Sequence, residues 1–420
     1  MKSNLVSRIT MMIVAFLCLF TYVGSAEAKT NDVIKIGICG PFSGFLLNFG
    51  EQQKAALDMA IEEQNAKGGL LGKKIVVFYE DDEYRPEVAI RKAKKLILED
   101  KVHILGSFLG THIASALNQV GAKYKKIVIN NGGMGDIIQG KLFNRYAFRL
   151  RYNAHAMITG LILYMKETKV RKIYIISPDY VYGHDTAKTF KTQLEKYIPD
   201  ATIVGEDYHP LRNKEFGPYV SKIIASKADG VFTVSYGSDS RLLIKTAREM
   251  GLKAPFPFFT YAALNIGLMR EMGEGNEQVN GIVQAADYAF TVNTPGNKAF
   301  VKKWNDKFKH EKDANWWWPG LSGGMCYAGW QMVFAAIEKA GTLDTEKIID
   351  TFEGMWFKSI LGWWAMRKCD HQLILPIFVL QASSQSNPWY PFPWVAPEYR
   401  VFPASEAALP PTHKYNKRCP

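Results

Sequence analysis

The sequence has little cysteine and lacks the usual metal-binding patterns. Only 5 of its 420 residues are cysteine, and no two of them are spaced as C-x-x-C. None of the 8 histidines forms an H-x-x-x-H pair, so the spacing typical of zinc sites is missing. We therefore expect neither a metal nor another cofactor. A chain of this length can bury a large core without a scaffold of disulfides.

Long apolar runs are missing after the first thirty residues, and the run before that is short. Residues 9–23 are almost all apolar; they follow the basic residues Lys2 and Arg8 and precede the mostly small residues 24–28. Because about 20 apolar residues are needed to span a bilayer, this pattern indicates a secretory signal peptide rather than a membrane anchor. We expect a signal peptide over residues 1–28, cleaved after Ala28, and an exported protein.

Charge of one sign does not dominate, although basic residues exceed acidic ones. Lys and Arg number 52 against 40 Asp and Glu, which gives a formal net charge of +12. The chain is 47% hydrophobic and 22% charged, so disordered and fibrous classes are excluded for the chain as a whole. Because the protein is exported, we expect no nucleic-acid partner. The basic charge favours an acidic ligand or an acidic membrane partner.

Apolar runs and helical periodicity alternate along the chain. The first part predicts strands and helices in strict alternation, at 33–39, 52–66, 74–79, 86–99, 102–105, 113–123 and 126–130. The same alternation restarts at 171 and ends near 285. It predicts parallel sheets with right-handed crossovers. We therefore expect an α/β protein with two doubly wound lobes, on which the later helices pack at 297–309, 321–340 and 345–352.

The last part of the chain has a different composition. Residues 383–420 contain eight prolines and several large aromatic residues. Proline disfavours helices and central strands, while the aromatic residues argue against a free tail. We expect an extended strap that lies over a lobe. The four cysteines outside the signal peptide allow three full pairings, and the sequence does not choose among them; one pairing, Cys369–Cys419, would pin the strap.

Two glycine-rich motifs are similar to parts of enzyme sites. Gly320-Leu321-Ser322-Gly323-Gly324 matches G-x-S-x-G, but a nucleophile elbow needs a strand before its serine, and 316–319 reads Trp-Trp-Trp-Pro. A secreted hydrolase that uses Ser322 is kept as an alternative hypothesis. Gly132-Gly133-Met134-Gly135 follows the fourth predicted strand rather than the first, which disfavours a dinucleotide site. We expect a turn whose backbone faces a cleft.

Several segments occur in the order found in one family of transport proteins. They are Ile36–Gly44, Phe49-Gly50, Ala60–Gly72, Tyr79–Asp82, Tyr182-Gly183 and Ala247–Leu252. In this order, after a signal peptide, they resemble the type I periplasmic solute-binding proteins, specifically the branched-chain amino-acid (Leu/Ile/Val)-binding family of ABC importers. The resemblance covers about residues 33–382.

The resemblance implies two Rossmann-like lobes joined by three crossover segments, near Leu150, Ala285 and Gly362. Lobe one would comprise 31–149 and 286–361, lobe two 150–285 and 362–382, and the tail 383–420. The resemblance also implies a function. A non-enzymatic, monomeric protein in the periplasm would capture an amino acid or related small carboxylate by hinge closure and deliver it to an inner-membrane ABC permease. A sensory ligand-binding module of the same fold is an alternative.

The resemblance also implies which residues bind the ligand. Gly110 and Thr111 occupy the loop that holds a ligand carboxylate, and a helix that starts there offers free N–H groups to an anion. Gly132 and Met134 occupy the next loop, which contributes backbone groups. The aromatic side chains expected to line the cleft are Phe49, Tyr182 and Tyr236.

Tyr261 departs from the pattern of this family. It aligns with a carboxylate that pairs with the ammonium of an amino-acid ligand, and Asp239 on a neighbouring loop is the alternative acid. Without an acid, a fully buried ammonium would lack a partner, at a cost of several kcal/mol. The departure leaves open a second class of solute, namely an aromatic carboxylate, an amide or a larger aromatic molecule.

Overall fold

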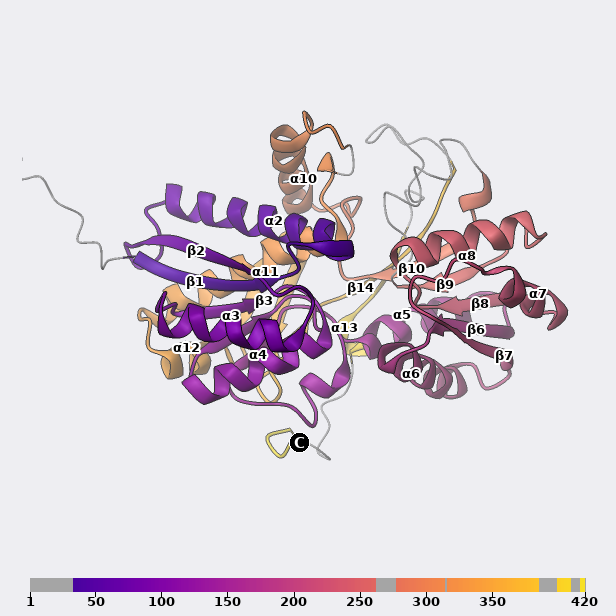
Figure 1. Cartoon of the computed structure of the whole chain (residues 1–420), viewed down its shortest axis with the longest axis horizontal. Helices are drawn as coiled ribbons and strands as arrows, with labels where there is room; N and C mark the ends of the chain where they lie inside the picture. Colours follow the sequence, from indigo (N-terminus) through magenta and orange to yellow (C-terminus); the bar gives the residue numbers. More distant parts are fainter. Residues whose placement is uncertain (1–32, 262–276, 314–315, 385–398, 409–415, 420) are drawn as a thin grey trace, which may run out of the picture.

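The computed structural model describes residues 33–261, 277–313, 316–384, 399–408 and 416–419. Within these residues, two large sheets covered by helices lie side by side as two lobes (Figure 1). The predicted α/β class with two doubly wound lobes is confirmed. In this part of the chain, each helix is too short or too polar to cross a membrane.

Lobe one is built on a parallel five-stranded sheet in the order β2-β1-β3-β4-β5. Its central strands are short apolar runs because helices cover both faces. α2 and α11 pack together on one face, although they are far apart in the sequence, and α3 and α4 cover the other (Figure 1). The bounds are β1 (Val33–Gly40), β2 (Lys74–Asp81), β3 (Ile104–Ser107), β4 (Ile127–Asn130), β5 (Ala147–Arg149), α2 (Leu47–Ala66), α3 (Pro86–Leu98), α4 (Thr111–Tyr124), α10 (Pro295–Phe308), α11 (Leu321–Ala340) and α12 (Thr345–Phe352).

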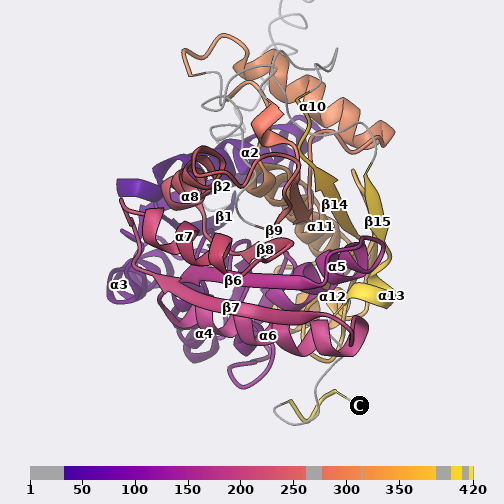
Figure 2. The same ribbon diagram turned by 90° about the vertical axis from the view of Figure 1, so that its right-hand side faces the viewer.

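Lobe two is built on a seven-stranded sheet in the order β15-β14-β10-β9-β8-β6-β7. The strands from β7 to β10 are parallel, and β14 and β15 add antiparallel strands at one edge. α7 and α8 cover one face, and α5 and α6 cover the other (Figure 2). The bounds are β6 (Lys172–Pro178), β7 (Thr202–His209), β8 (Gly230–Thr233), β9 (Phe258–Thr260), β10 (Ile282–Ala286), β14 (Ile377–Gln381), β15 (Arg400–Phe402), α5 (Ala154–Lys166), α6 (Val181–Tyr197), α7 (Gly217–Ala225) and α8 (Gly237–Glu249).

The chain returns to lobe two later than the crossover expected near Gly362. A third, small sheet contains β11 (Trp356–Ser359), β12 (Gly362–Met366) and β13 (Leu373–Ile374). Gly362 has φ = +110° and lies in the tight turn between β11 and β12, which is why it is a glycine. The strand that next joins the sheet of lobe two is β14, so the third crossover lies close to Ile377.

Buried polar side chains link segments that are far apart in the sequence. Arg151, just after β5, places Nε 2.7 Å and Nη2 2.9 Å from the carboxylate oxygens of Asp287, just after β10. Gln372 accepts a hydrogen bond from Nε of Arg149 at 2.7 Å and donates to the backbone oxygen of Arg151 at 2.6 Å. These contacts hold together three segments that run at the boundary between the two sheets.

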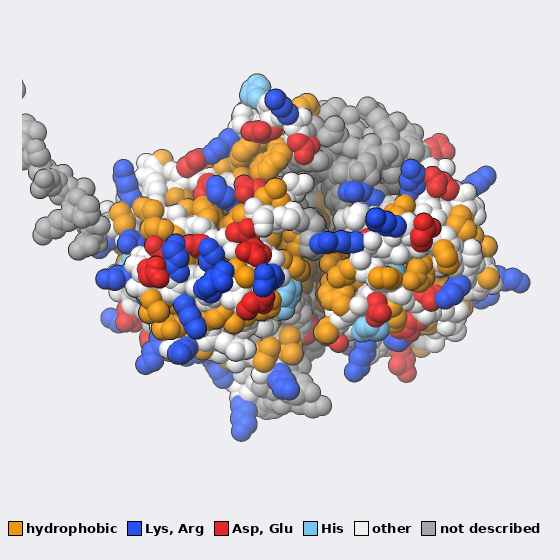
Figure 3. Space-filling view, viewed as in Figure 1, with side chains coloured by type: hydrophobic (Ala, Val, Ile, Leu, Met, Phe, Trp, Pro, Cys, Tyr) orange, Lys and Arg blue, Asp and Glu red, His pale blue; other side chains and the backbone are white. Residues whose placement is uncertain are grey.

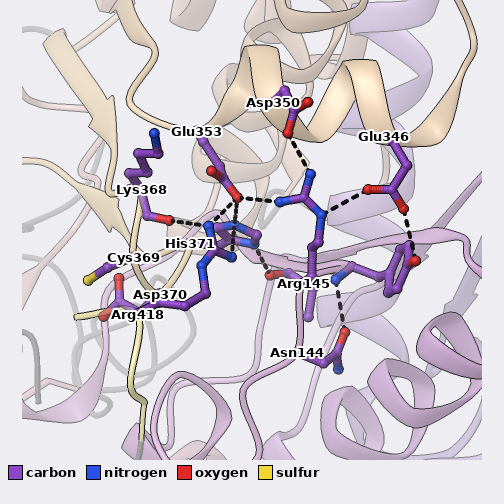
Figure 4. Close-up of polar contacts among 12 residues, drawn as sticks. Asn144, Arg145, Glu346, Asp350, Glu353, Lys368, Cys369, Asp370, His371 and Arg418 are labelled. Carbon is purple, nitrogen blue, oxygen red and sulfur yellow. Dashed lines mark hydrogen bonds and ion pairs between the residues drawn. The ribbon is translucent and has the colours of Figure 1, made fainter. Parts of the chain in front are cut away.

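The tail is attached to both lobes. β15 adds an edge strand to lobe two, and α13 (Ala404–Ala407) packs against α5. A disulfide joins Cys369 to Cys419, one of the pairings that the sequence allowed, while Cys39 and Cys326 are free and buried. Next to it, Arg418 pairs with Glu353 after α12 (Figure 4). We call this group the tail anchor; its members are Arg145, Glu353, Cys369, His371, Arg418 and Cys419.

Candidate functional site

The candidate residues lie beyond the carboxyl ends of strands from both lobes. In lobe one, Gly110 follows β3 and Gly132 follows β4; in lobe two, Tyr182, Tyr236 and Tyr261 follow β6, β8 and β9. Open parallel sheets bind ligands at this edge. Figure 3 shows a hollow between the two lobes. The candidate site is therefore made of loops from both sheets.

Four tyrosines of lobe two form one cluster. The ring centroids of Tyr182 and Tyr261 are 6.2 Å apart, edge to face, and those of Tyr180 and Tyr182 are 5.7 Å apart. The hydroxyl of Tyr180 donates to that of Tyr236 at 3.4 Å. The side chain of Tyr261 is buried, and its hydroxyl makes no well-formed hydrogen bond within the described part of the chain. The tyrosine cluster therefore combines an aromatic wall with an unsatisfied polar group.

Tyr84 of lobe one approaches this cluster from the other side. Burial raises its pKa, and the nearby hydroxyls of Tyr236 and Tyr182 raise it further. Its ring lies over Gly110, where an added Cβ would be 2.8 Å from Cε2 of Tyr84. The sequence analysis selected neither Tyr84 nor Tyr180. The available signal was position, because Tyr84 follows β2 just as the selected residues follow their strands.

Gly110 and Thr111 form the open start of α4. Gly110 has φ = +88°, a value that favours glycine, and no side chain caps the first turn. The hydroxyl of Thr111 accepts a hydrogen bond from the N–H of Gly135 at 3.0 Å. A hydroxyl can accept and donate at the same time, so its proton can still be given to a ligand. The free N–H groups of this turn suit an anion.

α6 and α8 start in the same way as α4. Their N-cap residues, Tyr180 and Tyr236, make no side-chain cap and belong to the tyrosine cluster. Among the other helices, α5, α10 and α12 are capped by the side chains of Asn153, Thr294 and Asp344, whereas α2, α3, α7 and α11 also start without a side-chain cap. Three uncapped helix starts therefore adjoin the candidate site, and their partial positive charges favour an anion.

The loop after β4 is held tightly by its neighbours. A Cβ at Gly132 would lie 2.1 Å from the carbonyl oxygen of Phe108, so only glycine fits there. The carbonyl of Met134 accepts a hydrogen bond from the N–H of Ala154 in α5 at 2.9 Å. The backbone of Met134 thus links the lobes, and its carbonyl is already engaged.

A model of the periplasmic binding protein family matches residues 33–387. The chain belongs to this family. Among its relatives, Leu/Ile/Val-binding protein homolog 4 of Brucella melitensis is 24% identical over 385 residues, covering 88% of this chain and 89% of the relative. The leucine-, isoleucine-, valine-, threonine-, and alanine-binding protein of Pseudomonas aeruginosa is 24% identical over 353 residues, covering 80% and 87%. The predicted resemblance to the branched-chain amino-acid type is confirmed.

Solved structures share the fold of this periplasmic binding protein. The leucine-, isoleucine-, valine-, threonine-, and alanine-binding protein of Brucella ovis, in a closed conformation, matches with a TM-score of 0.79 and 24% identity, over 90% of this chain and 97% of that one. A solute binding protein of an ABC transporter from Rhodopseudomonas palustris, in complex with 3,4-dihydroxy benzoic acid, matches with a TM-score of 0.77 and 23% identity, over 89% and 98%.

Two further predicted residues of this periplasmic binding protein are not part of the tyrosine cluster, although burial and, to a smaller extent, the charge of Asp239 raise the pKa of Tyr236. The carboxylate of Asp239 is buried and accepts a hydrogen bond from the N–H of Arg212 at 2.8 Å. Nδ1 of His209 lies 3.9 Å from the same carboxylate. Phe49 lies within α2, which begins at Leu47 rather than at the expected 52, and its side chain is 39% exposed. One oxygen of Asp239 is therefore engaged within lobe two, while Oδ1 is buried and has no hydrogen-bond partner among the described residues.

Asp136 is an acid near the tyrosine cluster that the sequence analysis did not select. It opens the short helix η2 (Asp136–Ile138). Burial raises its pKa to about 6, although the charge of Arg149 and the N–H of His155 oppose the shift. The pKa of Tyr261 is raised by burial and, to a smaller extent, by Asp136. Asp136 thus interacts electrostatically with both Arg149 and Tyr261.

The surroundings of Ser322 do not support the hydrolase hypothesis. Ser322 lies in the first turn of α11, and residues 316–320 before it form no strand. Nη1 of Arg151 donates to its hydroxyl at 3.3 Å, and a guanidinium cannot act as a general base. His371 is instead engaged by Glu353 at 2.9 Å and by the backbone oxygen of Ala147 at 3.0 Å.

Potential metal ligands come together in the tail anchor. Cys369, Asp370 and Cys419 are the described residues whose ligand atoms lie close enough to share an ion. The two sulfurs are bonded to each other, and Asp370 pairs with Arg367. These side chains are therefore already used in holding the tail.

Proposed function

We propose that the protein is the solute-binding component of an ABC importer. It binds a small carboxylate between its lobes, closes around it by a hinge motion and presents it to an inner-membrane permease. The proposal includes export: residues 1–28 are removed after Ala28, and the mature protein acts in the periplasm. Membership of the periplasmic binding protein family supports this role and location.

The observation that carries the proposal is the set of uncapped helix starts beside the tyrosine cluster. α4 belongs to lobe one, whereas α6 and α8 belong to lobe two. A carboxylate between the lobes can receive N–H groups from both of them only when they are close together. Binding then favours the closed conformation, and closure is what a permease can recognise. The proposed ligand-binding residues are Phe49, Tyr84, Gly110, Thr111, Gly132, Met134, Tyr180, Tyr182, Tyr236, Asp239 and Tyr261.

The relatives support a carboxylate as the ligand. The name of the Pseudomonas aeruginosa relative records binding of leucine, isoleucine, valine, threonine and alanine, and the Rhodopseudomonas palustris structure holds 3,4-dihydroxy benzoic acid. Both kinds of ligand are small molecules that carry a carboxylate. The proposal therefore rests on the carboxylate, which the two classes share.

Thermal unfolding of the ligand-free protein in the presence of small carboxylates tests the proposal. A ligand at a hundred times its Kd should stabilise the protein by about 2.7 kcal/mol. Thr111→Val keeps the shape of the side chain but removes the hydroxyl, so it should weaken this stabilisation. Thr192→Val, on the exposed side of α6, is the matched control. The proposal fails if neither amino acids nor aromatic acids raise the melting temperature.

The proposal also holds that the protein acts without catalysis and as a monomer. Ester turnover that disappears in Ser322→Ala would contradict the first point. Light scattering of the purified protein, with and without ligand, measures the oligomeric state, and a dimer would contradict the second point. Mass spectrometry of the exported protein tests the proposed cleavage after Ala28.

A further inference from the structure

We infer that Arg149 is a positioning residue of the solute site, which orients Thr111 through the turn after β4. This inference rests on the proposed function, because it concerns the same carboxylate site. Arg149 is the last residue of β5, and its side chain is fully buried. It therefore acts through the groups that its guanidinium holds.

The guanidinium of Arg149 holds the turn after β4. Nη1 donates to the carbonyl oxygen of Gly135 at 2.7 Å and, with a longer bond, to that of Gly133 at 3.3 Å. Nε donates to Oε1 of Gln372 at 2.7 Å, which fixes the orientation of the guanidinium plane. Because the donors of a guanidinium form a rigid, planar fork, the two glycine carbonyls are fixed relative to β5.

The same turn contacts the residue that is proposed to bind the carboxylate. The N–H of Gly135 donates to Oγ1 of Thr111 at 3.0 Å. A Cβ on Gly135 would lie 2.7 Å from Cγ2 of Thr111, so the turn also packs against this side chain. Since one lone pair of the hydroxyl is engaged, its proton is left for the carboxylate of a solute. Arg149 and Thr111 thus bind the carbonyl oxygen and the N–H of the same residue.

Gln372 extends this contact to the segments between the lobes. It donates to the backbone oxygen of Arg151 at 2.6 Å, and the side chain of Arg151 pairs with that of Asp287. These residues lie on three segments at the boundary between the two sheets. The turn that holds Thr111 and the proposed hinge therefore share one network of buried hydrogen bonds.

Stability alone explains Arg149 poorly. Burial of a charge costs free energy that its interactions barely offset, and an apolar side chain of similar volume often serves as well. Nη2 of Arg149 is buried without a hydrogen-bond partner in the described part of the chain, which adds to this cost. An apolar side chain, however, could not hold the carbonyl of Gly135. The geometry of the turn is thus what the guanidinium provides.

A double-mutant cycle, measured by calorimetry on the full mature chain, tests the inference. The probe is whichever of leucine, alanine, benzoate and 3,4-dihydroxybenzoate binds the wild type most tightly. We expect Arg149→Met to weaken binding about tenfold in the wild type but less than about twofold in a Thr111→Val background, because Arg149 acts through the hydroxyl of Thr111. Arg149→Lys should weaken binding nearly as much, since an ammonium keeps the charge but lacks the planar fork.

Arg248→Met is the matched control for the loss of a buried arginine. Arg248 lies in the last turn of α8, is 6% exposed and donates to the carbonyl oxygens of Leu252 at 2.7 Å and Asn280 at 2.9 Å. These carbonyls precede β9 and β10, at the opposite edge of the sheet from the candidate site. Both variants lose comparable bonds inside the protein, so only Arg149→Met should change the affinity for the probe.

Three results would overturn the inference and leave the importer proposal standing. The first is equal weakening by Arg149→Met with and without the hydroxyl of Thr111. The second is full affinity in Arg149→Lys, because the charge alone would then suffice. The third is an equal loss of affinity in Arg248→Met, which would reflect general destabilisation. If no amino acid or aromatic acid binds the wild type, the proposed function fails, and the inference fails with it.

A second variant serves if Arg149→Met does not fold. Gln372→Met removes the acceptor that orients the guanidinium but keeps Arg149 itself. It should weaken binding of the probe about threefold in the wild type and leave it unchanged in the Thr111→Val background. The same weakening in both backgrounds would again overturn the inference.

Discussion

Two buried polar clusters in this protein differ in how completely their polar groups are paired. In the tail anchor, the carboxylate of Glu353 accepts hydrogen bonds from Arg145 at 3.1 Å, His371 at 2.9 Å and Arg418 at 2.5 Å (Figure 4). In the tyrosine cluster, the hydroxyl of Tyr261 interacts with that of Tyr182 but makes no well-formed hydrogen bond, and one oxygen of the nearby Asp136 has no partner among the described residues. One cluster is complete, and the other is not.

This difference separates a structural role from a binding role. Buried polar groups in folded proteins almost always have a hydrogen-bond partner, because leaving one unpaired costs about 1–3 kcal/mol. The tail anchor meets this rule from protein groups alone and fixes the end of the chain to lobe one. The tyrosine cluster meets it when a ligand or a bound water supplies the missing partners. The same physical rule thus marks the tail anchor as part of the fold and supports the proposed binding role of the tyrosine cluster.

Removal of the disulfide should have the largest effect on stability and so tests the structural half of the comparison. Cys369→Ser with Cys419→Ser opens a loop with a sequence separation of 50, whose closure contributes at most about 4 kcal/mol by chain entropy. Urea unfolding should show a lower midpoint for the double variant. Reductant should lower the midpoint of the wild type but leave the variant unchanged. An unchanged midpoint in the variant would show that the tail anchor does not need the bond.

Glu353→Gln should have the next largest effect. The variant removes the charge that Arg145 and Arg418 share and that also accepts a hydrogen bond from His371, so we expect a loss of about 3 kcal/mol in the free energy of unfolding. Glu346→Gln is the matched control, because Glu346 pairs with the same Arg145 but its side chain is 49% exposed. The control should lose less than about 1 kcal/mol. Equal losses in both variants would contradict a special role for Glu353.

The two clusters should also respond to pH in opposite directions. Burial alone would raise the pKa of Glu353, but hydrogen bonds from His371 and Arg418 lower it from 4.5 to about 2. Its contribution to stability is therefore present above about pH 4.5 and is lost as the pH falls toward 2. Burial raises the pKa of Asp136 from 3.8 to about 6, so the folded state holds this proton more tightly and loses stability as the pH rises from about 4 to 6.

Unfolding free energies measured between about pH 2.5 and about pH 7 check both signs. Glu353→Gln should flatten the curve below about pH 4.5, and Asp136→Asn should flatten it between about 4 and 6. If Asp136→Asn changes the slope only below pH 4, the carboxyl of Asp136 is not shifted as its burial requires.

Much of the fold was predictable because parallel strands covered on both faces are apolar runs. β1, β3 and β4 lie within two residues of the predicted bounds at each end. The third crossover was placed too early, because Gly362 looks like a hinge glycine in the sequence but serves a hairpin turn. The disulfide pairing could not be predicted for a similar reason. No local feature of the sequence shows that Cys39 and Cys326 are buried separately in lobe one.

The candidate site was predictable only where it follows a known pattern. Gly110, Tyr182 and Tyr261 were selected from aligned segments, and each lies at a strand end. Tyr84 was missed because its neighbours come from lobe two, about a hundred residues or more along the chain, and only the topology brings them together. Asp239 was selected as the alternative acid; a backbone N–H from the preceding loop binds one of its oxygens, and the other has no hydrogen-bond partner among the described residues.

The smallest expected change in stability gives the sharpest test of the comparison. Tyr261→Phe removes a buried hydroxyl that makes no well-formed hydrogen bond, so the free energy of unfolding should change by less than about 0.5 kcal/mol or increase slightly. Tyr79→Phe is the matched control, since the hydroxyl of Tyr79 donates to Asp58 at 2.6 Å and its removal should cost about 1 kcal/mol or more. Solute binding should show the reverse order, with Tyr261→Phe the more damaging variant. A stability loss in Tyr261→Phe as large as that in Tyr79→Phe would mean that the tyrosine cluster is already complete without a ligand.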